Sequence, residues 1–156
     1  MKTIPLSRGR CTLVNDRFYH RLVAMGSWTY NPKGYTQKWH NGTTIQMHRV
    51  IWSMAGRPLP RQLDHKDRNG LNNQLGNLRA ATPLQNMFNR GPSRRNKCGY
   101  KGVCWRPNRH GFEARIMTKD KRKSLGVFGT AKDAAKAYDR AAKKYQGEFA
   151  YLNLAT

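Results

Sequence analysis

The chain has 156 residues and carries 30 lysines and arginines against eight aspartates and glutamates, which gives a formal net charge of +22. A charge of this sign and size attracts a polyanion, and nucleic acid is the partner that it favours. The charge alone fits a solubilising coat or a basic RNA-binding protein equally well. No apolar run is long enough to span a membrane, and the N-terminus lacks the apolar core of a signal peptide, so we expect no membrane partner.

The three cysteines, Cys11, Cys98 and Cys104, are odd in number and form no Cys-x-x-Cys pair. They argue against a disulfide framework or a standard zinc ribbon and fit a reducing cytoplasm. Free thiols are favoured over a metal site built from Cys98, Cys104 and His110, because such a site lacks a fourth ligand.

The length leaves room for one ordinary domain or two small ones. Residues 1–90 carry 14 basic and 3 acidic side chains and residues 91–156 carry 16 and 5, so each half has a net charge of +11. Around the junction, residues 90–97 combine the helix breakers glycine and proline with four basic residues. We place a short basic linker at 91–98 and expect both halves to contact phosphates.

Short strands are expected at 10–14, 27–30 and 35–40, with Asn31-Pro32-Lys33-Gly34 as a hairpin turn between the last two. A helix is expected over 44–54, because four apolar residues there have the spacing of one helix face. These residues are Met47, Val50, Ile51 and Met54.

A further strand is expected at 62–65, running into a loop at 67–70. Asn72 or Asn73 can then cap a single helical turn. Thr82 and Pro83 fit the cap and first position of a longer helix. This order of elements predicts a hairpin followed by a helix.

The most informative stretch of the chain begins with Asp64 and His65. A histidine beside an aspartate offers a general base next to an oxygen ligand for a hard divalent metal. Asn77 and Asn86 can complete such a site without adding negative charge that would repel a phosphodiester. Taken alone, an Asp-His pair is more often a turn-forming acid beside a solvated imidazole, and asparagines are more often turn residues. In combination they indicate metal-assisted cleavage of nucleic acid.

Residues 4–90 resemble the HNH endonucleases of phages and mobile introns, whose core is a ββα-metal motif. The resemblance is carried by the opening Ile4-Pro5-Leu6-Ser7-Arg8-Gly9 and by Met47-His48-Arg49, Leu63-Asp64-His65-Lys66-Asp67, Asn72-Asn73, Asn77-Leu78-Arg79 and Gln85-Asn86-Met87-Phe88-Asn89-Arg90. His48 is expected to be a structural or phosphate-contacting residue rather than a metal ligand.

The resemblance implies that Asp64 binds the metal and that His65 is the general base. It further implies that Asn77 holds the hairpin loop and the orientation of His65, and that Asn86 is the second metal ligand. Asn86 is preferred to Asn89 because it lies 21 residues after His65. The resulting His-Asn-Asn variant favours one Mg²⁺ or Mn²⁺ ion per site over zinc.

In the second half, three alternating strands with glycine at the turns are expected, followed by an alanine-rich helix over 131–146. Small side chains on the inner face would let this helix approach the sheet closely. The residues expected on that face are Ala134, Ala137, Tyr138, Ala141 and Tyr145.

Residues 99–153 resemble the plant ethylene-response-factor-like (AP-two type) DNA-binding domain, which also occurs fused to phage HNH nucleases. The resemblance is carried by Gly99-Tyr100-Lys101-Gly102-Val103, Phe112-Glu113-Ala114-Arg115-Ile116, Leu125-Gly126-Val127-Phe128-Gly129-Thr130, the helix from Ala134 to Ala142 and Tyr151-Leu152-Asn153. It implies a three-stranded antiparallel sheet packed on one helix, with the exposed sheet face entering the major groove of double-stranded DNA.

The resemblance also implies a set of DNA-contacting side chains. Four would reach bases or phosphates, and the tryptophan would lie against sugar and phosphate: Arg106, Arg109, Arg115, Lys123 and Trp105. Any one of these arginines could equally contact phosphates only. The chain departs from the pattern at Cys104, Phe112 and Glu113, where an arginine, a tryptophan and a basic residue are common, so no base preference can be transferred.

The sequence thus predicts an α+β chain with an HNH endonuclease domain at 1–90, a linker at 91–98 and a DNA-binding domain at 99–156. The expected function is a metal-dependent, homing-type and nicking DNA endonuclease whose target is chosen largely by the C-terminal domain. We expect a monomer without a small-molecule cofactor beyond the metal, acting in the cytoplasm of a phage-infected bacterium. Two alternatives remain open: a catalytically inactive, sequence-specific DNA-binding regulator, and a basic RNA-binding structural protein.

Overall fold

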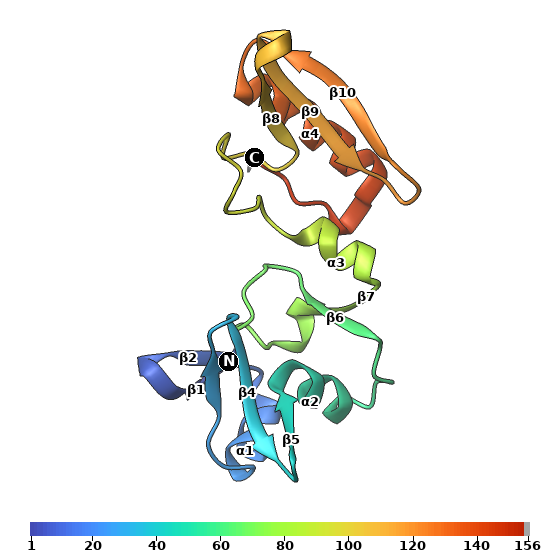
Figure 1. The fold of residues 1–156 in the computed structure, drawn as a ribbon. Coiled ribbons are helices and arrows are strands. Elements are labelled where there is room, and N and C mark those ends of the chain that lie inside the picture. The colour runs from blue at the N-terminus through green and yellow to red at the C-terminus, as the bar shows by residue number, and fades with distance from the viewer. Residues whose placement is uncertain (155–156) are drawn as a thin grey trace. The chain divides into compact units, whose positions relative to one another are not determined.

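The structure is a computed structural model that describes residues 1–154. The chain divides into two compact units, Met1–Thr82 and Pro83–Thr156. Each unit contains helices and small antiparallel sheets (Figure 1), so the mixed α and β content expected from the sequence is confirmed. The expected boundary at residue 90 stays a prediction, and the helix that begins at Pro83 belongs to the second compact unit.

The first unit contains three small antiparallel sheets and two α-helices. Its first sheet pairs β1 (Lys2–Pro5) with β2 (Cys11–Val14), and its second has the order β3 (Thr29–Asn31), β4 (Tyr35–His40), β5 (Thr43–Gln46). Its third pairs β6 (Gln62–His65) with β7 (Leu78–Ala81). The helices are α1 (Asp16–Ala24) and α2 (Met47–Met54), with short 3-10 turns η1 (Ser7–Gly9) and η2 (Leu75–Asn77).

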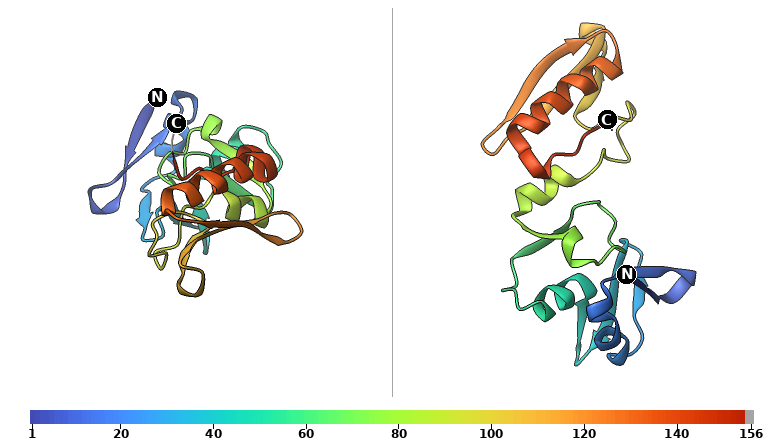
Figure 2. Two further views of the ribbon diagram at one scale, coloured as in Figure 1. Left: turned by 90° about the horizontal axis from the view of Figure 1, so that it is seen from above. Right: turned by 180° about the vertical axis from the view of Figure 1, so that it is seen from behind.

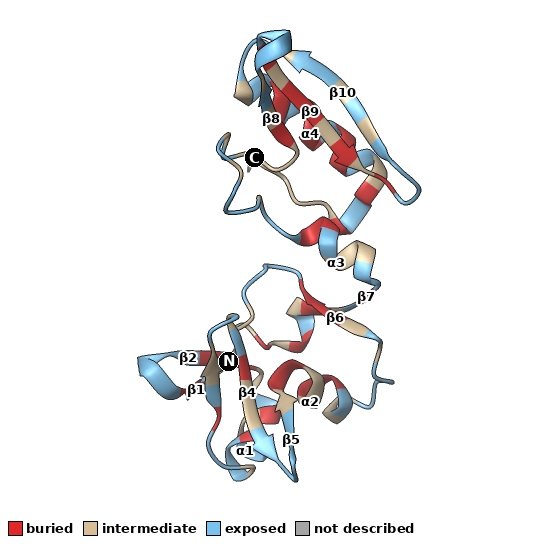
Figure 3. Ribbon diagram, in the orientation of Figure 1, coloured by how far each residue is buried: buried red, intermediate tan, exposed pale blue. Residues whose placement is uncertain are grey.

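One apolar cluster holds the first unit together (Figure 3). Each helix contributes a pair of buried residues four positions apart, and this spacing places both on one face of the helix. These pairs are Phe18 and Leu22 from α1, and Met47 and Ile51 from α2.

The strands at 35–40 and 62–65 and the turn at 31–34 are found where the sequence predicts them. The predicted helix over 44–54 is wrong at its start, because the first three residues belong to strand β5 and the helix begins at Met47. Ile45 packs on the core while its neighbour Thr44 is exposed, which is the alternation of a strand.

The second unit begins with α3 (Pro83–Asn89), followed by β8 (Val103–Arg106), β9 (Gly111–Met117) and β10 (Arg122–Phe128) in one sheet of order β10-β9-β8. The 3-10 turn η3 (Pro107–Arg109) joins β8 to β9. Helix α4 (Ala131–Gln146) covers one face of this sheet, and η4 (Gly147–Phe149) follows it (Figures 1 and 2).

The helix predicted over 131–146 has those bounds in the structure. Thr130 caps it by accepting a hydrogen bond from the amide of Asp133 at 3.1 Å. Tyr138 is buried against Gly102, whose positive φ and lack of a side chain both matter. A Cβ at Gly102 would lie 2.3 Å from the Tyr138 ring, so only glycine allows this close approach.

A lysine further along the second unit binds the carboxyl end of α3. The Lys101 ammonium donates hydrogen bonds to the carbonyl oxygens of Met87 at 3.2 Å, Phe88 at 2.6 Å and Arg90 at 2.7 Å. The last carbonyls of a helix have no partner within the helix, so a cation there is doubly favourable. Helix α3 also packs against η4.

None of the helices within residues 1–154 is long and apolar enough to cross a membrane.

Candidate functional site

The β6–β7 hairpin positions the two residues that the sequence singles out most strongly. In its register Asp64 lies opposite Arg79 and His65 lies opposite Leu78. Both predicted residues are buried, with 5% of each exposed. Buried polar side chains require partners, so their contacts define the site.

Asp64 is paired with the arginine across the hairpin. Its Oδ2 accepts hydrogen bonds from Arg79 Nε at 2.9 Å and from Arg79 Nη2 at 2.8 Å. Both side chains are largely buried, which makes the contact stronger than an exposed ion pair. Arg79 therefore fixes the direction of the carboxylate.

His65 faces two rings and one carboxamide of its own unit. The centre of its ring lies 5.1 Å from that of His48, edge to face, and 5.9 Å from that of Tyr35. Its Nε2 lies 3.2 Å from Oδ1 of Asn73. Burial lowers the pKa of His65 below its ordinary value, against the opposing effects of the Asn73 hydrogen bond and of two nearby carboxylates. The imidazole is therefore neutral at pH 7, as a general base must be.

Asn73 is the residue that sequence reasoning missed. Its side chain is fully buried, and its amide nitrogen donates to Thr12 Oγ1 at 2.8 Å, Gly70 O at 3.3 Å and Thr36 Oγ1 at 3.4 Å. Because the amide nitrogen is bound by these three oxygens, the amide oxygen faces His65 and accepts a hydrogen bond from its Nε2–H group. The basic lone pair of His65 then lies on Nδ1.

The sequence suggested only a capping role for Asn72 or Asn73. In the turn that follows, η2, the first amide, that of Leu75, is bound by Asn15 Oδ1 at 2.8 Å, and not by Asn72 or Asn73. The sequence did contain a signal that Asn73 binds His65, since an asparagine pair after an Asp-His strand can reach back to the imidazole. The buried partners of Asn73 on β2 and β4 could not be read from local spacing.

Asn77 binds both ends of the loop between the two strands. Its amide nitrogen donates to Asp67 Oδ1 at 2.9 Å and to the Asn72 carbonyl at 2.8 Å, and its Oδ1 accepts from the Asp67 amide at 3.1 Å. Partial burial raises the pKa of Asp67, but hydrogen bonds from three asparagine residues lower it by more, so the net shift is downward. The loop thus has an ionised centre.

Asn86, the other predicted metal ligand, lies on α3 in the second compact unit, as does Asn89. Asn86 is partly exposed and Asn89 is buried. Their placement relative to Asp64 stays a prediction. Among residues 1–154, no three histidine, cysteine, aspartate or glutamate side chains gather as a metal-binding group.

His48 is buried, and its Nδ1 has no hydrogen-bond partner among residues 1–154. Burial, followed by the charges of His65 and Arg49, lowers the pKa of His48 to about 3. It is therefore a neutral ring packed against His65 and Tyr35.

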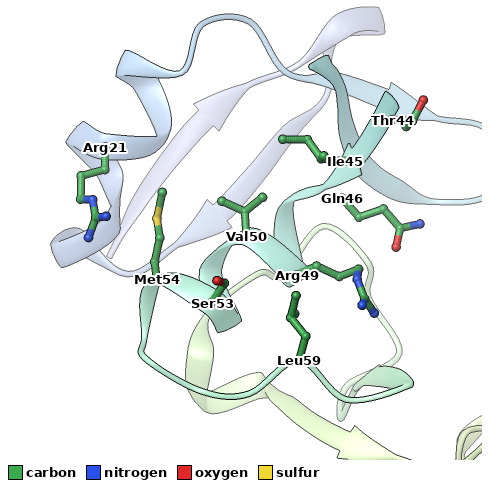
Figure 4. A pocket seen from close by; sticks show the side chains of 9 residues that line it. All are labelled: Arg21, Thr44, Ile45, Gln46, Arg49, Val50, Ser53, Met54 and Leu59. Atoms are coloured by element: carbon green, nitrogen blue, oxygen red, sulfur yellow. The ribbon is translucent and has the colours of Figure 1, made fainter. Parts of the chain in front are cut away.

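A groove of about 650 Å³ lies elsewhere in the first unit, between α2 and β5 (Figure 4). Its floor is apolar, and Arg21 and Arg49 contribute the charges of its lining. Neither Asp64 nor His65 lines it, so it is not the candidate active site.

In the second unit, the open face of the sheet is defined by cross-strand partners, which point to the same side. Cys104 lies opposite Glu113, and Ser124 lies opposite Arg115. Arg106 reaches Glu113 on this side. The face away from α4 thus presents two of the five predicted DNA-contacting residues around one acid.

Glu113 holds both arginines. Its Oε2 lies 2.6 Å from Arg106 Nε and 2.7 Å from Arg115 Nη2, and its Oε1 accepts from Ser124 at 3.0 Å. The Arg115 hydrogen bond most strongly, and then those of Arg106 and Ser124, overcome the effect of burial and lower the pKa of Glu113 to about 2. The acid is therefore ionised at neutral pH and orients two guanidinium groups.

The remaining predicted residues lie elsewhere. Trp105 is opposite Phe112 and Lys123 is opposite Ile116, on the side that packs against α4. Lys123 Nζ lies 4.7 Å from the centre of the Tyr145 ring. Trp105 stays 46% exposed at the edge, and Arg109 is exposed in η3. Alternation along the strands could have indicated this division.

Comparisons with known proteins agree with both halves of this picture. Residues 46–88 match the family model of the HNH endonucleases, and residues 98–148 match that of the AP2 domain. The chain is 32% identical over 135 residues to an uncharacterized HNH endonuclease of Acanthamoeba polyphaga mimivirus, covering 85% of this chain and 69% of the relative.

Two further relatives match smaller parts. Protein 3.8 of Escherichia phage T7 is 30% identical over 105 residues, which is 66% of this chain and 86% of that protein. Dehydration-responsive element-binding protein 2D of Arabidopsis thaliana is 36% identical over 86 residues, 54% of this chain and 42% of that protein. No solved structure matches.

The chain therefore belongs to the HNH endonuclease family and carries an AP2 domain in its second half. Both resemblances expected from the sequence are confirmed.

The burial of His48 predicts an acid-sensitive fold. An unfolded chain binds a proton on this ring below about pH 6.5, whereas the folded chain does so only near pH 3, so the free energy of unfolding falls as the pH falls between these values. His48→Phe should remove roughly 1.4 kcal/mol per pH unit of this slope. Urea unfolding between about pH 4.5 and 6.5 measures it. The exposed His20→Gln serves as the control, and equal slopes in wild type and His48→Phe would contradict the prediction.

The Glu113 contacts predict an effect on DNA binding. Glu113→Gln removes the charge that holds Arg106 and Arg115, so both become available to phosphates. Binding to a mixed-sequence duplex should become tighter, and the slope of log affinity against log salt steeper by about two units, one for each arginine. Fluorescence anisotropy at several salt concentrations measures both. Asp120→Asn makes the same change of charge at an exposed turn, and an equal effect there would show that net charge alone is responsible.

Proposed function

We propose that this protein is a metal-dependent DNA endonuclease of the homing type that nicks double-stranded DNA. Its first half would cut, and its AP2 domain would supply most of the affinity and the choice of target. The observation that carries this proposal is a buried His65 whose Nε2 lies 3.2 Å from Asn73 Oδ1, one residue from a buried carboxylate, inside the segment that matches the HNH model.

His65 is the proposed general base. Its Nδ1 takes a proton from a water molecule, whose oxygen forms the new bond to phosphorus while the bond to the leaving 3′ oxygen breaks. Asn73 fixes the ring by accepting a hydrogen bond from the Nε2–H group, and Asn77 holds the loop after His65 in shape. The leaving 3′ oxygen takes a proton from solvent, and the proton that His65 gains is passed to solvent, which restores the base.

Asp64 and Asn86 are the proposed ligands of one Mg²⁺ or Mn²⁺ ion. The donor set fits such an ion, because a carboxylate and a carboxamide offer hard oxygen atoms, and Mg²⁺ uses few protein ligands and keeps several waters. It does not fit a closed zinc site, which needs four nitrogen or sulfur ligands. When bound, the ion supplies charge stabilisation for the phosphate and the leaving oxygen.

The AP2 domain is the proposed target-reading part. Arg106 and Arg115 are held in fixed positions by Glu113, as side chains that read base edges must be. Arg109 lies between them in the chain and is exposed, so it can contact a phosphate. Trp105 and Lys123 would act at the edge of the sheet rather than on its open face.

His65→Ala should lower the rate of plasmid nicking by about 10²–10⁴-fold, because a general base contributes that much. Affinity for DNA should change little, since it depends on many cationic contacts. Conversion of supercoiled to open-circular plasmid measures the rate, with His20→Ala as a matched control. A wild type that binds but never cuts would identify the inactive regulator instead, and a preference for duplex RNA would identify the RNA-binding alternative.

EDTA should stop the reaction, and Mg²⁺ or Mn²⁺ should restore it. Asp64→Asn keeps the shape of the side chain but removes its charge, so it should raise the metal concentration needed for half-maximal nicking. With one His65 per monomer, nicked circles should precede linear product. Full activity in excess chelator would exclude the metal mechanism, and linear product without a nicked intermediate would exclude the nicking one.

A further inference from the structure

The β3–β4–β5 sheet has one face on the core and one open face. Tyr30 and Ile45 pack against the apolar cluster, and Thr36 is fully buried. Neighbouring strand residues point to opposite sides, so the alternate positions form the open face. This open face consists of seven residues, none of which is buried: Thr29, Asn31, Tyr35, Gln37, Trp39, Thr44 and Gln46.

The strand register confirms that these residues share a side. Gln37 lies opposite Thr29 and Gln46, and Trp39 lies opposite Thr44. In Figure 4, Thr44 and Gln46 extend from one side of β5, while Ile45 extends from the other toward Val50 and Met54.

The chemistry of the open face suits a polyanion with bases and sugars. Its side chains are hydroxyls, carboxamides and aromatic rings, and within the described stretch 29–46 it carries no carboxylate and no aliphatic residue. Residues 17–63 contain seven basic residues and no acidic one. An apolar protein partner would find little to bury here, whereas phosphates would meet no repulsion.

Trp39 stands at the tip of this face with 70% of its surface exposed. The turn after β4 contains Asn41 at φ 46° and Gly42 at φ 77°, and two such residues make a tight hairpin that holds its strands closely paired. The ring is therefore presented on a well-defined element. An aromatic ring presented in this way gains free energy when it buries apolar area against the sugars of a duplex.

The other end of the same strand reaches the candidate active site. The Tyr35 ring lies 5.9 Å from that of His65. Tyr35 and Trp39 are four residues apart on one face, which corresponds to about 14 Å along a strand. The same length spans about four base pairs of duplex DNA.

We propose that the open face of the β3–β4–β5 sheet is a second DNA-contacting surface, and that Trp39 packs on the duplex about four base pairs from the cut. The position relative to the cut rests on the proposed function of His65. The contact itself does not, because it concerns binding without cleavage. It adds to the AP2 domain a surface within the nuclease unit.

The first test measures binding of the full-length protein to a short mixed-sequence duplex in EDTA. Trp39→Ala should weaken binding by about tenfold, the effect of losing the apolar area that the ring buries against the sugars of the duplex. The salt dependence should stay unchanged, since no charge is removed. Trp39→Phe should retain most of the affinity. Val23→Ala, which truncates a side chain 46% exposed on α1 of the same unit, is the matched control.

The second test observes Trp39 directly. Trp28 and Trp52 are 3% and 7% exposed, so in a Trp105→Phe variant the tryptophan open to acrylamide is Trp39. Adding the duplex should protect it from quenching. Thermal unfolding shows whether each variant is folded.

Unchanged affinity of Trp39→Ala, or full quenching of Trp39 in the complex, would overturn the proposal. Because both measurements are made in EDTA, they stand apart from plasmid nicking. A protein that protects Trp39 but never cuts would refute the proposed function and leave this surface in place.

Discussion

A single buried carboxamide determines the arrangement around the candidate base. Asn73 is fully buried and must satisfy both ends of its amide inside the protein, because an unpaired buried polar group costs about 1–3 kcal/mol. It does so by joining Thr12 of β2, Thr36 of β4 and the ring of His65. One amide therefore binds elements far apart in the chain, and its hydrogen bonds determine the tautomer of the imidazole.

The few acids of this basic chain are used in a similar way in both halves. Asp64 orients Arg79 in the nuclease unit, and Glu113 orients two arginines in the AP2 domain. In a chain of net charge +22, many cationic side chains are available to pair with a buried carboxylate. Removing either member of such a pair would leave a buried charge uncompensated. Charge thus supplies both the attraction to DNA and the rigidity of the side chains that would read it.

The elements with the clearest periodicity could be predicted from the sequence. The alanine-rich helix at 131–146 and the strand at 62–65 have their expected bounds, because spacing and end signals agree there. The sequence wrongly predicts helix over most of β5, since Met47 and the apolar residues after it dominate the hydrophobic pattern of the segment 44–54. Helix α1 was not predicted at all.

The candidate site likewise contains residues that a local pattern could indicate and residues that depend on distant contacts. Asp64, His65 and Asn77 could be named from a local pattern and a family resemblance. The role of Asn73 could not, because its partners lie on strands up to 61 residues away. The sides taken by Trp105 and Lys123 depend on strand register, which a list of basic residues does not contain.

The hydrogen bonds of Lys101 have a consequence for how such proteins can be recombined. The match to the HNH model extends to residue 88, yet the helix at its end is held by a lysine of the AP2 domain and packs on η4. An exchange of DNA-binding domains at residue 90 would leave that helix without its anchor. A chimera joined between Thr82 and Pro83 would carry the helix along with its support, so the structural unit to exchange begins before the HNH match ends.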